Sequence, residues 1–470
     1  MTQPLLHLSE DEQKSFDRLA TMHDEERNEL ERYDRWYEGT ESARYMHEEI
    51  FRESGQRIPE VRVFLSQIAV DSLAERLFVQ GFKTGDEDLD KDLHRVWAAN
   101  GMDVGLSQAI TDALVMRRSY ISVGTNPDDP QTPIVCPESP LEVYVRYDAQ
   151  TRKPKEALRR WCVYDINGLL VEEYATLYLP DSTIHLENHS GWVVEDRDDH
   201  KLGEVPIATL ANRPRTSAVM NGPRGSRRER IGRSELAGVI PLNHAMNKLA
   251  TDAMVAAERV AIPLRAIFGA GPDEFKDENG NQITPMKAMQ DGLLAIPEPT
   301  VTAFQFAAAQ LSNFTDMMRA ISNEAAAVTG LPPHYLGTPS DNPASAEAIA
   351  ASESRLATHA ELKQLPFGEG VLRAARLWRR IQTGEWEDRV KAAKVDWRDV
   401  RTPTVGARAD AAQKLFSSKI LPLRNVRGEL GYSDDEIDAM EVEDEAEAQR
   451  SPAGQLVTRL ADQAPGAVGA

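Results

Sequence analysis

The sequence predicts an α+β protein in which helical segments flank a strand-rich middle. Three observations lead to this prediction. Residues 1–118 are amphipathic and charge-rich, residues 119–214 carry short apolar runs separated by turn residues, and long helical patterns follow residue 235. A chain of 470 residues is expected to hold two to four domains.

The first 118 residues are predicted to form four helices and one short strand. Leu19, Leu30 and Tyr33 fall on neighbouring turns of the first helix. The second helix is expected to bury Val61, Phe64, Leu65, Ile68, Leu73 and Leu77. The predicted elements are helices over 9–37, Val61–Leu77, Asp88–Asn100 and Gly105–Met116, and a strand at Phe78–Phe82.

Residues 119–214 are predicted to form a β-rich module inserted between helical regions. Turn residues at Asn126–Pro130, Asn167–Gly168 and Pro180–Asp181 separate its apolar runs. The expected strands cover Tyr120–Val123, Glu142–Val145, Arg160–Tyr164, Glu173–Tyr178 and Gly191–Val194.

A basic, Gly/Pro-rich loop follows at 213–233, and it is the one strong positive run of the chain. Its arginines are Arg213, Arg215, Arg224, Arg227, Arg228, Arg230 and Arg233. Such a loop either binds phosphate or serves as an intersubunit or surface loop that neutralises the acidic remainder. We favour the second interpretation.

The chain then predicts a helix over Leu236–Arg259, with Pro241 near its start. Two strands are expected beyond it, at Ile262–Phe268 and Gly292–Ile296, around a polar excursion over 271–284.

Apolar residues recur at steps of three and four between 311 and 328, which predicts one helix with an apolar seam. The seam residues are Leu311, Phe314, Met318, Ile321, Ala325 and Val328. Gly330 is expected to end this helix, and Pro332 and Pro333 prevent its continuation.

A short polar loop follows the seam helix. Its residues are Gly337, Thr338, Pro339, Ser340, Asp341 and Asn342. A second long helix is predicted from Pro343 to about Ile381, with Asn342 as its N-cap. Two long helices around a tight polar loop suit a mechanical role better than a catalytic one.

The formal net charge is −21, from 54 Lys and Arg against 75 Asp and Glu. Such a chain should repel nucleic acid in bulk, because DNA carries about one charge per 1.7 Å, so any DNA contact must be local. The acidic run Asp434–Glu447 is read as a solvated helix end, or alternatively as a surface that keeps DNA moving. Residues 448–470 are Pro/Gly/Ala-rich, and we expect them to be disordered.

The two cysteines, Cys136 and Cys162, lie in strand-like sequence and are expected to stay reduced.

We also expect no membrane segment and no signal peptide, because the most apolar window contains charges and the first residues lack an apolar core.

Catalytic signatures are absent from the sequence. There is no G-x-x-x-x-G-K-[ST], no G-x-S-x-G and no H-E-x-x-H. His185 and His189 lie near Asp196 but read as exposed turn residues, and His334 reads as a packing or capping residue. We therefore predict no enzyme activity, no metal site and no cofactor.

The order of these segments resembles the portal proteins of tailed bacteriophages, the head-to-tail connectors of siphophages, over roughly 33–432. A strong block is Thr329–Gly337 with Asn342–Ile349. Further matching stretches are Val70–Leu77, Trp97–Asp103, Ala113–Tyr120, Gly203–Pro206, Asn212–Pro214, Gly232–Glu235 and Asn247–Glu258.

The resemblance implies a portal fold with a helical and β wing, a two-helix stem, a small α/β clip, a tunnel loop and a helical crown. The wing would be 1–230, helical over 1–118 and β-rich over 119–214. The remaining implied regions are stem helices 235–259 and 305–329, clip 260–304, tunnel loop 337–342, long wing helix 343–383, crown 384–447 and tail 448–470.

The resemblance also implies a ring, usually of twelve subunits, at one capsid vertex of the virion, assembled in the host cytoplasm. Double-stranded DNA would pass through its channel and face the tunnel loop. The implied partners are the terminase large subunit, capsid or scaffold proteins and head-tail connector (adaptor) proteins, with no membrane. The alternatives are another structural virion or scaffold protein, or a metal-dependent nucleic-acid hydrolase.

Overall fold

The structure is a computed structural model, and the chain divides into two compact units, Met1–Val400 and Arg401–Ala470. The residues that the structure describes are 7–41, 61–148, 150–188, 190–215, 219–221, 226–228, 232–261, 265–268, 302–305, 311–337, 346–401, 405–432 and 434–450.

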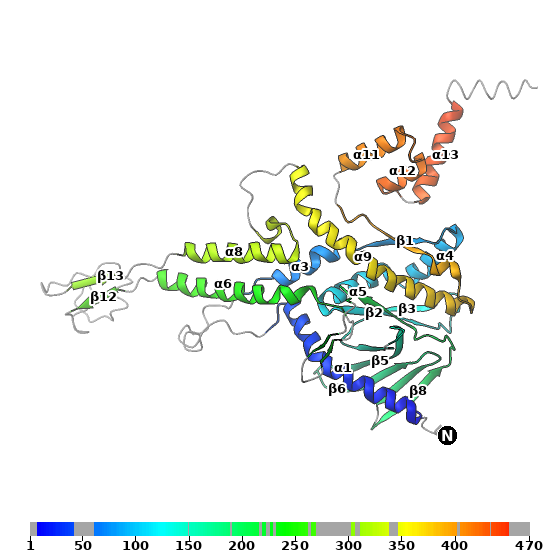
Figure 1. The fold of residues 1–470 in the computed structure, drawn as a ribbon, viewed down its shortest axis with the longest axis horizontal. Coiled ribbons are helices and arrows are strands. Elements are labelled where there is room, and N and C mark those ends of the chain that lie inside the picture. The colour runs from blue at the N-terminus through cyan, green and yellow to red at the C-terminus, as the bar shows by residue number, and fades with distance from the viewer. Residues whose placement is uncertain are drawn as a thin grey trace, which may run out of the picture. The chain divides into compact units, whose positions relative to one another are not determined.

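The N-terminal helix α1 (Glu10–Tyr37) lies against a five-stranded antiparallel sheet (Figure 1). Ser9 begins the helix with a capping box, in which its hydroxyl and the Glu12 carboxylate bind each other's backbone amides. Phe16 and Leu19 pack on one face of the sheet. The strands, in spatial order, are β4 (Val143–Tyr147), β5 (Pro154–Tyr164), β6 (Leu170–Tyr178), β7 (Thr183–Asn188) and β8 (Trp192–Asp198).

The opposite face of this sheet packs on a three-stranded sheet. Tyr120 and Ile207 of the smaller sheet join Val143, Ala157 and Tyr178 in one buried cluster. The smaller sheet has the order β3 (Ile134–Glu138), β2 (Arg118–Gly124) and β9 (Ile207–Ala211). Residues 119–214 therefore fold as two facing sheets, which the strand-and-turn pattern predicted in outline.

A large helical core covers the other side of the three-stranded sheet. Trp97, Phe82 and Trp378 stack edge to face there, with ring centroids 5.7 and 5.8 Å apart. Its elements are α3 (Leu65–Ala74), α4 (Glu87–Ala99), α5 (Met102–Met116), α9 (Ala346–Thr383), α10 (Asp388–Lys391) and the antiparallel pair β1 (Val79–Lys83) and β14 (Lys394–Trp397).

A helical hairpin leaves this core (Figure 1). Its helices α6 (Ile240–Ala261) and α8 (Ser312–Thr329) run side by side. A short helical turn, η1 (Glu235–Gly238), precedes α6, and another, η3 (Pro333–Leu336), follows α8. Between the two helices, β12 (Arg265–Phe268) and β13 (Thr302–Gln305) form an antiparallel pair, and a small hairpin of β10 (Val219–Asn221) and β11 (Ser226–Arg228) precedes η1.

The second unit contains α11 (Val405–Ser417), α12 (Leu423–Leu430) and α13 (Asp434–Arg450). Arg424 of α12 pairs with Asp438 and Glu441 at 2.7 and 2.9 Å, and Arg427 pairs with Asp444 at 2.7 Å. The acidic run 434–447 is therefore helical, and arginines of α12 partly neutralise it.

Several sequence-based boundaries were wrong. The second helix begins at Leu65 instead of Val61, and Phe64 is exposed instead of buried. The helix expected over 305–329 begins at Ser312, because Gln305 belongs to β13. Residues 384–400, which we expected in the crown, belong to the first unit, where β14 pairs with β1, and the second unit begins at Arg401.

Strands β3, β7, β9, β10, β11, β13 and β14 were not predicted. The expected strand Gly292–Ile296 and the polar excursion 271–284 lie outside the described residues, as do 451–470 of the expected tail, whereas residues 448–450 continue α13.

One prediction follows from His23, which α1 buries against the sheet. Its Nε2 lies 3.1 Å from the Pro140 carbonyl, and Arg160 lies 3.3 Å from Nδ1. Burial, followed by the charge of Arg160, lowers the pKa of His23 to about 4 from its ordinary 6.5. Below pH 6.5 the unfolded chain therefore binds a proton that the folded chain does not accept until about pH 4.

We expect His23 to contribute a loss of stability of roughly 3 kcal/mol between pH 6.5 and 4, since each pKa unit corresponds to about 1.4 kcal/mol. His23→Gln should remove most of this pH dependence, and His94→Gln, on the exposed face of α4, should retain it. Urea unfolding at a series of pH values measures both, and equal slopes in the two variants would contradict the prediction.

Candidate functional site

Two groups of polar side chains lie where the helical hairpin joins the core, and we call them together the hairpin root. Its members come from five separate stretches of the chain. They are Arg76, Asn212, Glu235, Tyr335, Glu353 and Lys363.

The first half of the root centres on a buried ion pair between Lys363 of α9 and Glu235 of η1. The side chains are 4% and 6% exposed. The Lys363 ammonium also donates to Asn212 Oδ1 at 2.7 Å, and Asn212 Nδ2 donates to Glu235 Oε1 at 2.9 Å. Arg213 reaches the other Glu235 oxygen at 2.8 Å. Both carboxylate oxygens and the buried ammonium are therefore bound, which offsets the cost of removing charges from water.

The second half joins the end of α8 to the start of α9. Arg76 contacts Glu353 and the Tyr335 hydroxyl, each at 3.2 Å, and Tyr335 donates to Glu353 at 2.9 Å. The same guanidinium donates to the Val400 carbonyl at 2.8 Å. One arginine thus holds α9, η3 and the last residues of the first unit together.

Local backbone geometry explains why the chain turns at the root. Gly330 ends α8 with φ +79, and a Cβ there would lie 2.9 Å from His359 of α9. Gly232, at φ +93, approaches the carbonyls of Arg117 and Asn212 so closely that a Cβ would lie 2.4 Å from each. Ser234 then begins η1 by accepting from the Leu236 amide at 3.0 Å.

The electrostatics of the root favour a structural role. Burial lowers the pKa of Lys363, and Glu235 opposes this shift. Burial and the hydrogen bond to Glu353 raise the pKa of Tyr335. Each of these groups is occupied by another protein group, so the root binds the hairpin to α9 instead of offering a free acid, base or nucleophile to a substrate.

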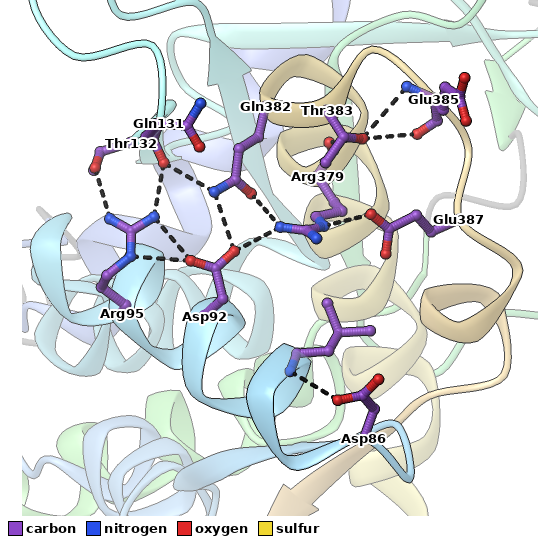
Figure 2. A network of polar contacts seen from close by, with 11 residues as sticks. Asp86, Asp92, Arg95, Gln131, Thr132, Arg379, Gln382, Thr383, Glu385 and Glu387 are labelled. Atoms are coloured by element: carbon purple, nitrogen blue, oxygen red, sulfur yellow. Dashed lines mark hydrogen bonds and ion pairs between the residues drawn. The ribbon is translucent and has the colours of Figure 1, made fainter.

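A second network fixes the far end of α9 (Figure 2). Arg379 and Gln382 point toward Asp92 of α4, at 2.6 and 3.1 Å. Arg95 holds the same carboxylate from its other side and reaches Thr132 and the Gln131 carbonyl. Helix α9 is therefore tied by polar side chains at both ends as well as at Lys363.

Helix α6 carries a further polar feature, a ladder formed by Asn243, Asn247 and Thr251. These residues lie one turn apart on one face. Their side-chain oxygens accept the backbone amides of Ser66, Val63 and Val61 at 3.3, 2.7 and 3.3 Å. The ladder thus binds the backbone of residues 61–63 outside the helix, and α3 begins four residues later than predicted.

From the sequence, parts of the root were noted only as stretches that resemble the portal family, and their polar contacts were not predicted. The ladder was not predicted either. A signal for the ladder was present, because Asn243, Asn247 and Thr251 recur every fourth residue within the apolar pattern of α6.

The predicted tunnel loop lies mostly outside the described residues. Gly337 is described and ends η3 with φ +72. Thr338, Pro339, Ser340, Asp341 and Asn342 are not among the described residues, and neither is Pro343. Their role stays a prediction.

The predicted seam of α8 is buried to different degrees. Ala325 is buried, and Met318 and Ile321 pack partly against the main core. Leu311 precedes the first helical residue and is 38% exposed, and Val328 is 42% exposed. Phe314 is half-buried. The apolar stripe therefore contacts the main core from Met318 to Ala325.

Other candidate sites remain isolated side chains. His185 bonds to Thr176 at 3.1 Å, and His189 lies outside the described residues. The His334 ring is exposed and stacks edge-on against Tyr335. Within the described ranges, no three His, Cys, Asp or Glu side chains are placed to hold a metal. No helix among the residues that the structure describes has the length and apolar character needed to cross a bilayer.

The family model for phage portal proteins of the SPP1 Gp6-like type matches residues 17–450. The portal protein of Mycobacterium phage D29 is 36% identical over 395 residues, which cover 81% of this chain and 78% of the relative. The portal protein of Mycobacterium phage L5 is 35% identical with the same coverage.

Among solved structures, the chain is similar to the neck of a native GTA (gene transfer agent) particle, with 15% identity and a TM-score of 0.44. The match covers 78% of this chain and 90% of that one. The neck of the empty GTA particle gives 13% identity, a TM-score of 0.46 and coverage of 84% and 98%.

The buried pair of the root generates a second prediction. Lys363→Met should lower the free energy of unfolding by about 3–5 kcal/mol, because it leaves the Glu235 carboxylate buried with fewer partners. Adding Glu235→Gln should recover some of this loss. The matched control is Lys83→Met, which removes an exposed pair with Asp396 and should cost at most about 1 kcal/mol. Urea midpoints measure all three, and equal effects of the two lysine variants would refute the assignment.

Proposed function

The chain belongs to the phage portal family of the SPP1 Gp6-like type, and on this premise we propose that its copies form a ring-shaped channel at one vertex of a virion capsid. DNA enters through this channel during packaging and leaves through it at ejection. The ring is expected to contain about twelve subunits.

The helical hairpin is the observation that carries this proposal. Its two long helices leave the core side by side and are held at the root by buried, saturated polar contacts. Such a hairpin suits the wall of a channel, because its orientation is fixed from one end while its faces remain available to neighbouring copies. We assign α6 and α8 to the stem and the segment between them to the clip.

The net charge supports a channel through which DNA slides. Each copy carries −21, so a ring multiplies the acidic excess around its lumen. A protein surface with few cations releases few of the counterions condensed on DNA, and therefore binds it weakly. We propose that the loop 337–342 is the segment that touches the passing duplex.

We further propose the partners of each region. The clip would contact the terminase large subunit during packaging and the adaptor proteins afterwards, and the wing would contact capsid or scaffold proteins. The second unit would form the crown. The terminase would hydrolyse ATP, so the portal needs no catalytic site of its own, and assembly would take place in the host cytoplasm.

Electron microscopy of the purified chain tests the proposed function. Class averages viewed down the symmetry axis should show closed rings of about a dozen subunits with an open centre. A preparation that contains only monomers or dimers at high protein concentration would contradict the proposal.

The tunnel-loop assignment makes a separate prediction. Asp341→Lys with Asn342→Lys should slow DNA packaging severalfold without preventing ring assembly, because added cations hold phosphates. The control is Asp341→Ala with Asn342→Ala, which adds no cation and should package at nearly the native rate. In vitro packaging measures both, and a native rate in the lysine variant would remove the DNA-facing role.

A further inference from the structure

The strands β5 and β6 continue beyond the five-stranded sheet as a two-stranded arm, residues 162–173. The register of β4 on β5 begins at Arg159, and that of β7 on β6 begins at Tyr174. The outer pairs, which begin with Cys162↔Glu173, therefore have no strand on either side among the described residues.

The arm displays large apolar side chains to solvent. Ile166 is 99% exposed, and Tyr164, Leu169 and Leu170 are 61%, 66% and 56% exposed. Isolated hairpins are marginally stable in water, and clustered exposed apolar groups mark interaction surfaces. The arm thus has the character of a surface that a partner covers.

The arm is nevertheless ordered by its own contacts. Asp165 Oδ1 accepts the amides of Asn167 and Leu169 at 2.8 Å each, which closes the turn at the tip. At the base, the Trp161 and Tyr174 rings stack with centroids 5.4 Å apart. A shape held in this way needs little ordering when a partner binds.

The charge of the arm narrows what can cover it. Residues 162–173 contain three carboxylates, Asp165, Glu172 and Glu173, and no lysine or arginine. Lysine and arginine side chains suit such a surface, because their charged ends meet carboxylates while their aliphatic stems cover apolar groups. Arginine also stacks on aromatic rings such as that of Tyr164.

A basic surface lies at the opposite end of the same sheet, and we call it the basic face. Lys153, just before β5, and Arg373 of α9 bind the two oxygens of the Glu204 carboxylate at 2.8 and 3.3 Å. Burial would raise the pKa of Glu204, but the hydrogen bond from Lys153 and the charges of Arg373 and Arg376 lower it. The cations of the basic face are Arg152, Lys153, Lys155, Arg373 and Arg376.

The basic face holds more positive charge than its own acidic side chains neutralise. Arg152 and Lys155 are exposed, and the Lys153 side chain is 61% exposed. The carboxylates that lie among these cations are Asp148, Glu204 and Glu369. An excess of cations therefore remains at the surface, where an acidic partner can reach it.

Copies of this chain repel one another overall, because each carries −21. A contact between copies consequently requires a local surface of opposite sign. Other exposed lysines of the described part suit this less well, because Lys83 and Lys414 each have a carboxylate of their own. Asp396 and Asp410 lie 2.7 and 2.8 Å from them.

Strand β5 connects the two surfaces and holds them apart. It begins at Pro154, beside the basic turn, and ends at Tyr164 in the arm. Its 11 residues span roughly 36 Å at about 3.3 Å per residue. A ring requires two different patches on each subunit, one that each copy offers and one that it receives. The arm and the basic face meet this requirement at opposite ends of one strand.

We infer that the β5–β6 arm of one copy docks on the basic face of a neighbouring copy. This inference rests on the proposed ring. The arm carboxylates meet the cations of the face, and the stems of those cations cover the apolar side chains of the arm. Phosphate binding by the basic face is the competing outcome of the test.

A charge swap tests the inference. Glu172→Lys with Glu173→Lys, the arm variant, should reduce the fraction of protein in rings at least tenfold. Arg152→Glu with Lys155→Glu, the face variant, should do the same. The chain that carries all four substitutions should recover rings to within twofold of native, because opposite charges again face each other. Electron microscopy of each purified chain measures the fraction in rings.

Two controls change the net charge by the same amounts at exposed positions elsewhere. They are Glu25→Lys with Glu385→Lys for the arm variant and Lys14→Glu with Lys91→Glu for the face variant, and both should assemble normally. Thermal unfolding identifies any chain that fails to fold. Glutamine at the same two positions then replaces the reversed charges, and it should reduce rings at least threefold.

The outcomes separate the inference from the proposed function. If the native chain forms no rings, both fail. If the native chain forms rings and either folded variant, arm or face, forms them equally well, only the docking inference fails. Normal rings of the face variant that package DNA slowly would overturn docking in favour of phosphate binding.

Cys162 supplies a second readout that requires no change in the arm. It is exposed on β5, opposite Glu173, whereas Cys136 is half-buried and burial raises the pKa of its thiol. N-ethylmaleimide should label Cys162 at least tenfold more slowly in native rings than in the unassembled face variant, whose arm is native. Peptide mass mapping follows the labelling, and equal rates would show that no neighbour covers the arm.

Discussion

The buried contact between Lys363 and Glu235 is the interaction on which the arrangement of the first unit depends. An ammonium group removed from water must meet a carboxylate and further acceptors, or it destabilises the fold by several kcal/mol. Lys363 meets these requirements only where α9, the end of β9 and the start of η1 come together. The direction in which the helical hairpin leaves the core is therefore set by an electrostatic requirement as well as by apolar packing.

Helix α9 connects this contact to the rest of the unit. Glu353, Lys363 and Arg379 are spaced along it by roughly 15 and 24 Å at about 1.5 Å per residue. The first two hold both ends of the helical hairpin, and the third holds α4. A displacement at the start of α9, next to the proposed tunnel loop, would therefore reach the hairpin and the core through these three side-chain contacts.

The sequence predicted the helices and the β-rich middle because their periodicities are local. The apolar steps from Leu311 to Val328 predicted the helix, but they could not show which of its turns contacts the chain's own core. Strand β14 could not be predicted from local patterns, because its partner β1 lies about 300 residues earlier in the chain. The root was also beyond prediction, since Arg76, Glu235 and Lys363 become neighbours only in the folded chain. The helix predicted from Val61 was too long at its start, because side chains of α6 bind the backbone amides of Val61 and Val63 outside the helix.

The ladder of α6 has a consequence for how this protein can change over generations. Asn243, Asn247 and Thr251 bind backbone amides, which every residue except proline possesses. The segment that they hold can consequently drift in sequence while its path stays the same. We therefore expect that any residue except proline at 61 or 63 can keep its hydrogen bond to the ladder, whereas a substitution at Asn247 or Thr251 removes that bond.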